Sequence, residues 1–301
     1  MEKVIIIAGP TGVGKTSTSI ALAKKVNGEI ISADSMQIYR QMDIGTAKVM
    51  PSEMEAIPHH LIDVINPQDE FTVSDFDTMA TKSILDIQGK SGTPIVVGGT
   101  GLYINSLIYA MDYNKVDGDE ELRNELWKFH EINGEDRLYE MLLELDPLTK
   151  IEKQNVKRVI RAIEIIKTTG EIGKFTEIPQ RTEFESDLYV LYRERENLYD
   201  IINQRVDSMI NQGLVSEVTA LMKMGLTKNN QSMKAIGYRQ IIAYLEGEYD
   251  FDTAIELIKR DSRRYAKRQL TWFKRYKNAI WLNADLLNTE EMVDKILIDK
   301  K

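Results

Sequence analysis

The sequence predicts an α/β protein in which a parallel sheet is flanked by helices and interrupted by a helical insertion. Three observations indicate this class. Short runs rich in β-branched residues end in glycine-rich or polar turns, helical patterns separate the runs, and a phosphate-loop sequence joins the first run to the first helix. Short buried strands that alternate with helices are typical of a parallel sheet covered on both faces.

The first part of the chain contains most of the expected strands. Strand-like runs cover residues 4–8, 29–33 and 94–97, and the third run ends in the glycine cluster at 98–101. Apolar residues recur at helical spacing over 15–26 and 73–88, between these runs. This order predicts strands connected by helical crossovers, as in an open parallel sheet.

The pattern changes near residue 112. Charged helical patterns follow at 119–131, 137–145 and 155–168, and strand-like runs return only at 188–192 and 279–282. We therefore predict a P-loop catalytic core formed by residues 1–113 and 187–301, with a helical insertion formed by residues 114–186.

The composition excludes several classes of protein. The chain has 301 residues, 43% of them hydrophobic, and no cysteine. It therefore has no disulfide framework, thiolate nucleophile, cysteine-ligated zinc or iron–sulfur cluster. The first apolar run is too short for a signal peptide or a membrane span, so we expect a cytoplasmic protein with no membrane contact.

The segment GPTGVGKT fits the phosphate-loop pattern GxxxxGK[ST] between a strand and a helix. Its glycines allow backbone N–H groups to surround an anion, and its lysine and threonine offer a positive charge and a magnesium ligand. The expected phosphate-binding residues are Gly9, Pro10, Thr11, Gly12, Val13, Gly14, Lys15 and Thr16, with Thr16 meeting Mg²⁺ partly through water.

Asp34 follows the second strand-like run. Ligands of an open α/β sheet bind at the carboxyl ends of its strands, so a carboxylate there can coordinate Mg²⁺ or accept a proton from a nucleophile. The other interpretation is a capping or turn residue, since aspartate is common in both positions.

Basic residues concentrate in one late stretch of a chain whose net charge is −8. Residues 258–277 contain nine lysines and arginines and a single acid, Asp261, and we expect a helix with a basic stripe. Lys153, Lys157, Arg158, Arg161 and Lys167 form a second cluster. A solvated helix face explains such charges, but two clusters in an acidic protein favour contact with a nucleic-acid backbone.

Taken together, seven ordered blocks resemble the tRNA dimethylallyltransferases of the shorter bacterial type. They are GPTGVGKT at 9–16, ISADSMQIYRQMDIGTAK at 31–48, HHLID at 59–63, VGGTGLY at 97–103, RVIRAIE at 158–164, KAIGYRQ at 234–240 and AKRQLTWF at 266–273. One departure is Lys153-Gln154-Asn155, where many members have Pro-Asn-Asp.

The resemblance implies transfer of a dimethylallyl group from dimethylallyl diphosphate to the N6 amine of an adenosine beside the anticodon of tRNA. The implied catalytic residues are Asp34 as general base, with Arg205, Lys15 and Thr11 acting on the diphosphate; Mg²⁺ is the only implied cofactor. The implied tRNA contacts are Asp34, Ser35, Met36, Gln37, Thr100, Arg123, Lys157, Arg158, Arg161, Lys234, Gly237, Tyr238, Arg239, Lys267, Arg268, Gln269, Trp272 and Lys274.

Three alternatives remain at this point. An adenylate isopentenyltransferase would use the same donor with a free nucleotide, although a small acceptor does not need a long basic helix. A P-loop small-molecule kinase would share the loop and the acid after the second strand. A non-catalytic nucleotide switch that binds RNA would also explain a phosphate loop with a basic helix. We expect the protein to act as a monomer.

Overall fold

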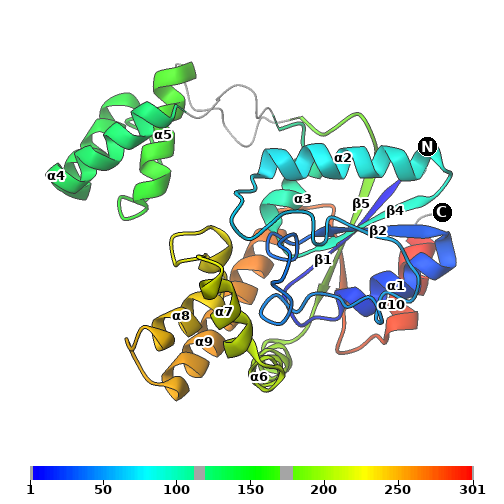
Figure 1. Ribbon diagram of the computed structural model, residues 1–301. Helices are drawn as coiled ribbons and strands as arrows, with labels where there is room; N and C mark the ends of the chain where they lie inside the picture. Colours follow the sequence, from blue (N-terminus) through cyan, green and yellow to red (C-terminus); the bar gives the residue numbers. More distant parts are fainter. Residues whose placement is uncertain (1–2, 112–118, 170–178, 300–301) are drawn as a thin grey trace. The chain divides into compact units, whose positions relative to one another are not determined.

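The computed structural model describes residues 3–111, 119–169 and 179–299 (Figure 1). The chain divides into two compact units, one formed by Met1–Ile108 with Arg181–Lys301 and the other by Tyr109–Gln180. The observed boundaries are at 108/109 and 180/181, so the expected boundaries at 113/114 and 186/187 lie a few residues after them. Residues 113 and 114 fall outside the described residues. Arg181 lies at the start of the returning chain, and its largely buried guanidinium pairs with Asp77 of the first unit at 2.7 Å.

The first unit is built on a six-stranded parallel sheet with the order β3-β2-β4-β1-β5-β6. The strands are β1 (Val4–Ala8), β2 (Gly28–Ala33), β3 (His59–His60), β4 (Thr93–Gly98), β5 (Ser186–Tyr192) and β6 (Ile280–Asn283). The central strand β1 is buried along its whole length and pairs with β4 and β5. The predicted parallel sheet is confirmed, and the two-residue β3 is an additional edge strand.

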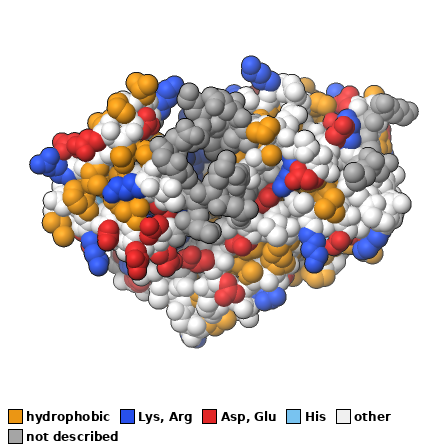
Figure 2. All heavy atoms as spheres, turned by 90° about the horizontal axis from the view of Figure 1, so that it is seen from above, with side chains coloured by type: hydrophobic (Ala, Val, Ile, Leu, Met, Phe, Trp, Pro, Cys, Tyr) orange, Lys and Arg blue, Asp and Glu red, His pale blue; other side chains and the backbone are white. Residues whose placement is uncertain are grey.

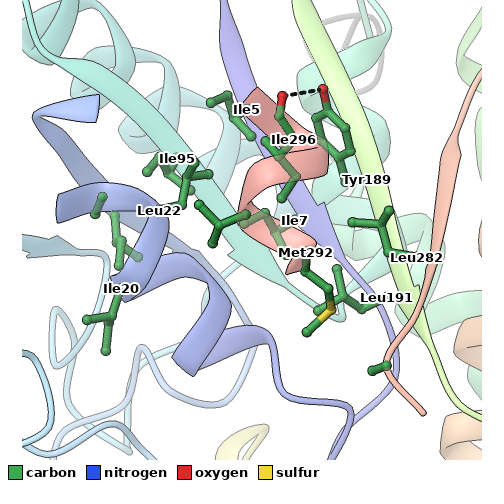
Figure 3. Close-up of a cluster of buried hydrophobic side chains, with 14 of the residues drawn as sticks. Ile5, Ile7, Ile20, Leu22, Ile95, Tyr189, Leu191, Leu282, Met292 and Ile296 are labelled. Carbon is green, nitrogen blue, oxygen red and sulfur yellow. Dashed lines mark hydrogen bonds between the residues drawn. The ribbon is translucent and has the colours of Figure 1, made fainter. Parts of the chain in front are cut away.

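Helices cover both faces of this sheet (Figure 1). On one face α1 (Lys15–Val26) and α10 (Thr289–Asp299) pack against inward residues of the strands. Figure 3 shows Ile5 and Ile7 of β1 with Leu22 of α1 and Met292 of α10 in this core. The opposite face is covered by α2 (Val73–Gly89) and α3 (Gly101–Ile108). Alternate β1 residues therefore serve the two faces, as the period of a strand requires.

A block of helices lies beside the carboxyl ends of the strands in the same unit. It consists of α6 (Arg195–Gln212), α7 (Leu214–Lys223), a short 3₁₀ turn (Ser232–Lys234), α8 (Tyr238–Leu245) and α9 (Phe251–Phe273). The long α9 contacts α3, α6 and α8. The expectation of a helix through residue 277 was wrong at its end, because α9 stops at Phe273 and the chain turns toward β6.

The second unit is a helical pair, α4 (Glu120–Leu145) and α5 (Val156–Thr169). Gly134 interrupts α4 with φ 80° and ψ 174°, which separates the two helical patterns seen in the sequence. A small core of aliphatic side chains joins the helices, including Leu126, Leu142 and Ile163. This unit therefore has a hydrophobic core of its own.

The described surface carries charges of both signs. Figure 2 shows acidic and basic side chains interspersed with hydrophobic ones on one face. Within residues 3–111, 119–169 and 179–299, no helix combines the length and apolar composition needed to cross a lipid bilayer.

Candidate active site

The phosphate loop connects the end of β1 to the start of α1. Gly12 and Gly14 have φ values of 80° and 104°, in the region that glycine adopts without strain. The first turn of α1 contains no acidic residue, and no side chain caps its N-terminus. Backbone N–H groups and the positive end of the helix dipole are therefore left for an anion.

Lys15 lies at the start of α1 with its ammonium group folded over the loop. Its Nζ donates hydrogen bonds to the carbonyl oxygens of Gly9 at 3.0 Å and Pro10 at 2.8 Å. Burial lowers the pKa of Lys15 to about 8, the Asp34 charge opposes this shift, and the Arg205 charge reinforces it. Lys15 therefore places a titratable positive charge at the loop.

Arg205 reaches the same loop from α6. Its Nη1 donates to the hydroxyl of Thr11 at 3.1 Å. Burial lowers the pKa of Arg205, while the charges of Asp34 and Glu53 partly restore it. Because an arginine has a very high intrinsic pKa, the group stays charged at neutral pH. Two cations from distant segments thus converge at the phosphate loop.

Asp34 directly follows β2. Its Oδ1 accepts hydrogen bonds from the backbone N–H groups of Met36 at 2.9 Å and Gln37 at 3.4 Å. Its Oδ2 has no hydrogen-bond partner in the part of the chain that the structure describes. The neighbouring N–H of Ser35 donates to the Thr100 hydroxyl at 3.1 Å. One oxygen of Asp34 therefore fixes the turn, and the other can take part in chemistry.

Gln269 of α9 connects two loops of the site. Its Oε1 accepts from the N–H of Thr11 at 3.1 Å, and its Nε2 donates to the carbonyl of Gly99 at 2.9 Å. The side chain is buried. We expected Gln269 at the RNA, but the structure uses both ends of its amide inside the protein.

Tyr265 of α9 is a site residue that the sequence analysis missed. It lines the same cavity as Asp34. Burial raises the pKa of Tyr265 to about 12, helped by the negative charge of Asp34. Its position four residues before Gln269, one helical turn away, was the only available signal.

These side chains surround a cavity of about 1350 Å³. Pockets for one small ligand usually measure about 300–1,000 Å³, so this one has room for more than a diphosphate. The cavity brings together the expected residues Thr11, Gly12, Val13, Gly14, Lys15, Thr16, Asp34, Ser35, Met36, Gln37, Arg205, Lys234, Arg239, Arg268 and Gln269.

The remaining core residues expected at the RNA lie outside this cavity lining. Lys267 and Lys274 are exposed at the end of α9. Tyr238 is fully buried, and the Trp272 ring packs so closely on Gly101 that a Cβ there would approach it to 2.4 Å. Gly237 is also buried, and Thr100 binds Ser35. The structure thus separates exposed cations from residues that support the site.

One acid organises much of the basic surface of the core unit. Asp261 pairs with Arg239 at 2.8 Å and Arg260 at 3.0 Å, and lies 3.9 Å from Arg264. Burial opposes ionisation of Asp261, but hydrogen bonds from Arg260 and Arg239 outweigh it and lower its pKa. Asp261 therefore stays ionised and holds arginines of α8 and α9 together.

The second unit presents its own cations. Lys157 and Arg158 are exposed on α5. Arg123 and Arg161 both pair with Glu164, whose side chain is fully buried, at 2.8 Å and 2.9 Å. Glu164 therefore fixes the positions of two arginines that we expected at the RNA.

Comparison with known proteins agrees with this geometry. The family model described as IPP transferase matches residues 37–276. The chain is 50% identical to the tRNA dimethylallyltransferases of Alkaliphilus oremlandii and Clostridioides difficile; the alignments cover 100% and 99% of this chain and 97% and 98% of theirs. These alignments include the phosphate loop and Asp34, which precede the segment matched by the family model.

Solved structures are similar over the same length. The full-length tRNA isopentenylpyrophosphate transferase of Bacillus halodurans is 43% identical, with a TM-score of 0.76 over 100% of this chain and 97% of that one. A eukaryotic dimethylallyltransferase acting on tRNA is 31% identical, with a TM-score of 0.83 over 99% of this chain and 78% of that one. The chain belongs to the IPP transferase family, among the tRNA dimethylallyltransferases.

Proposed function

We propose that this protein transfers a dimethylallyl group from dimethylallyl diphosphate to the N6 amine of an adenosine beside the anticodon in tRNA. The observation that carries the proposal is the convergence of Asp34, Lys15 and Arg205 on one cavity. A carboxylate beside two cations suits a reaction in which a proton leaves one substrate and a diphosphate leaves the other.

The diphosphate half of the reaction uses the phosphate loop. As the allylic carbon–oxygen bond breaks, its electron pair leaves with the diphosphate, and negative charge grows on the departing oxygen. Lys15, Arg205 and the loop N–H groups are preorganised donors for this charge. Arg205 is held by Thr11, so its guanidinium needs little reorganisation.

The adenine half uses Asp34. The exocyclic amine of adenine is a weak nucleophile because its lone pair is delocalised into the ring. Oδ2 of Asp34 accepts a proton from this amine as the new nitrogen–carbon bond forms. Oδ1 stays bound to Met36 and Gln37, which keeps the carboxylate oriented.

Magnesium fits this site as a partner of the diphosphate. Among the described residues no group of three or more His, Asp or Glu side chains could hold a metal ion. Mg²⁺ retains several waters and binds proteins through one or two ligands plus substrate phosphates, so such a cluster is not needed. The Thr16 hydroxyl at the start of α1 would hold the ion, which would neutralise charge on the leaving group.

The acceptor must be held by its backbone before its base can enter the cavity. A stacked adenine has to be turned out of its loop at a cost of a few kcal/mol, which contacts to the phosphates must offset. Lys234, Arg239 and Arg268 line the cavity as exposed cations. These residues are our proposed contacts for the anticodon loop.

The deciding experiment combines the protein with Mg²⁺, labelled dimethylallyl diphosphate and unmodified tRNA. We expect prenylated adenosine in the RNA after nuclease digestion. Transfer only to free AMP would indicate the adenylate isopentenyltransferase, and consumption of ATP with a small acceptor would indicate a kinase. If no group is transferred to any acceptor, a catalytic role is contradicted, and the non-catalytic nucleotide switch that binds RNA is the remaining interpretation.

Asp34→Asn tests the base separately. The amide keeps an oxygen for the N–H groups of Met36 and Gln37 but cannot accept the proton. We expect turnover to fall by about 10²–10⁴-fold with little change in tRNA affinity. A large loss of affinity with turnover retained would contradict the role of Asp34 as base.

A further inference from the structure

Glu217 of α7 binds a backbone segment shortly after residues 34–37, which line the cavity. Its Oε2 accepts from the backbone N–H groups of Asp43 at 2.9 Å and Ile44 at 2.7 Å. Its Oε1 accepts from the N–H of Gly45 at 3.1 Å and from the Tyr238 hydroxyl at 2.6 Å. Four donors thus share one carboxylate, and these hydrogen bonds fix its position against the turn.

The bound segment is a tight turn over residues 43–47. Within it the N–H of Ala47 donates to Ile44 at 3.0 Å and that of Lys48 to Asp43 at 2.9 Å. The first N–H groups of such a turn have no internal partner, and Glu217 supplies one from outside. Gly45 lies against the Tyr238 ring, where an added Cβ would approach the ring to 2.4 Å.

The other end of the turn binds Gln37. The Nε2 of Gln37 donates to the carbonyl oxygens of Thr46 at 3.4 Å and Ala47 at 3.2 Å. Gln37 lines the same cavity as Asp34, and its backbone N–H lies 3.4 Å from Oδ1 of that residue. With its N–H groups engaged by the turn, the amide presents its oxygen as the polar atom that remains for a ligand.

Lys48 also stabilises this turn, through contacts that do not involve Glu217. Its buried Nζ contacts the carbonyl of Tyr39 at 2.7 Å, Asp43 at 2.7 Å and Asp63 at 2.5 Å. The turn is therefore fixed on both sides, and Glu217 is its link to α7 and α8.

We infer that Glu217 is a positioning residue that sets the orientation of Gln37 in the cavity beside Asp34, acting through the turn at 43–47. The expected effect of Glu217 on catalysis rests on the proposed function; its effect on the turn does not. The amide oxygen of Gln37 suits the N–H of an exocyclic amine and disfavours a carbonyl at the same place on a base. Glu217 therefore contributes to acceptor selection without touching the acceptor.

The first test measures structure and needs no activity. Hydrogen exchange in the peptide covering residues 43–48 is compared between the parent and Glu217→Gln. In the variant one acceptor oxygen is replaced by an NH₂ group, which cannot accept hydrogen bonds from the backbone N–H groups of the turn. We expect exchange at 43–45 to become at least about tenfold faster. The matched control Glu248→Gln, which removes an exposed partner of Lys228, should leave it unchanged. Unchanged protection in Glu217→Gln would overturn the inference even if no prenyl transfer is found.

The second test measures coupling with Gln37. Glu217→Gln should lower kcat/KM for tRNA about tenfold and leave dimethylallyl diphosphate affinity within about twofold. In a Gln37→Ala background the same change should cost less than about twofold, because the group it positions is already absent. Tyr238→Phe, which keeps the three backbone donors, should give a smaller loss. Independent, multiplicative losses for Glu217 and Gln37 would overturn the inference.

Discussion

The guanidinium of Arg205 donates a hydrogen bond to the hydroxyl of Thr11, although 194 residues separate them in the sequence. This contact ties α6 to the phosphate loop and orients a cation before any substrate binds. Preorganised charge of this kind stabilises a leaving group without reorganisation during the reaction.

Replacement of Arg205 should therefore affect the chemical step. Arg205→Ala should lower the single-turnover rate at saturating donor by about 10²–10³-fold, the usual effect of removing one preorganised donor. Thr11→Val keeps the charge and loosens its placement, so its effect should be smaller. An Arg205→Ala variant with a normal single-turnover rate and weakened tRNA binding would assign Arg205 to RNA contact instead.

Donor affinity should depend on pH through Lys15. Burial lowers the pKa of Lys15 to about 8, and a bound diphosphate favours its protonated form. Affinity for dimethylallyl diphosphate should thus be constant between about pH 7 and 8 and then weaken by up to about tenfold per unit above pH 8. Calorimetric titration measures this. Lys15→Arg keeps its charge and should bind with a flat profile, whereas a flat profile in the parent would contradict the prediction.

Local sequence patterns predicted the parts of the fold and site that depend on local structure. Val4–Ala8 is a β-branched run before a loop that fits GxxxxGK[ST], and this pattern predicts a strand followed by a phosphate site. Asp34 was found because it follows a strand at the edge where ligands bind. Arg205 was predicted as a site residue only through the family resemblance, because no local sequence pattern around it indicates a catalytic role.

Contacts between distant segments could not be predicted in this way. Tyr265 looks like an ordinary residue of a basic helix until α9 is packed against the phosphate loop, and Gln269 was expected at the RNA with no sign of its contact to Thr11. Glu217 lies in an amphipathic helix with no unusual pattern, and three of its partners are backbone N–H groups more than 170 residues away. Backbone donors have no sequence signature, so such a site is visible only in three dimensions.

Glu164 should control the stability of the helical unit. Its buried carboxylate binds Arg123, Arg161 and the N–H of Asp119. Both arginines stay partly solvated, so losing their hydrogen bonds to the carboxylate should cost about 1.5–3 kcal/mol, and Glu164→Ala should make α4 and α5 exchange faster. Glu140→Ala removes an exposed partner of Arg137 and should cost less than about 1 kcal/mol.

The same pairing predicts loss of stability in acid. Burial opposes ionisation of Glu164, but its two arginine partners outweigh this and lower its pKa below the usual 4.5. A lowered pKa stabilises the folded state above pH 4.5, and that stability is lost as the pH falls below this value. Exchange protection in α5, taken relative to the intrinsic exchange rate at each pH, should therefore fall below pH 4.5 in the parent. If the Glu164→Ala variant showed the same acid sensitivity, Glu164 would not be its source.

The exposed end of α9 should supply much of the salt-dependent affinity for tRNA. Arg264, Lys267 and Arg268 are exposed there, and Arg268 also lines the cavity. Each cation that neutralises a phosphate releases counterions, so the slope of log affinity against log salt falls by about 0.7–0.9 for each contact removed. Replacing all three with alanine should flatten the slope by about 2. Lys82, Lys90 and Lys228 are exposed lysines outside the site, and their replacement removes equal charge. If both triple variants flatten the slope equally, the effect comes from net charge alone and α9 is not the interface.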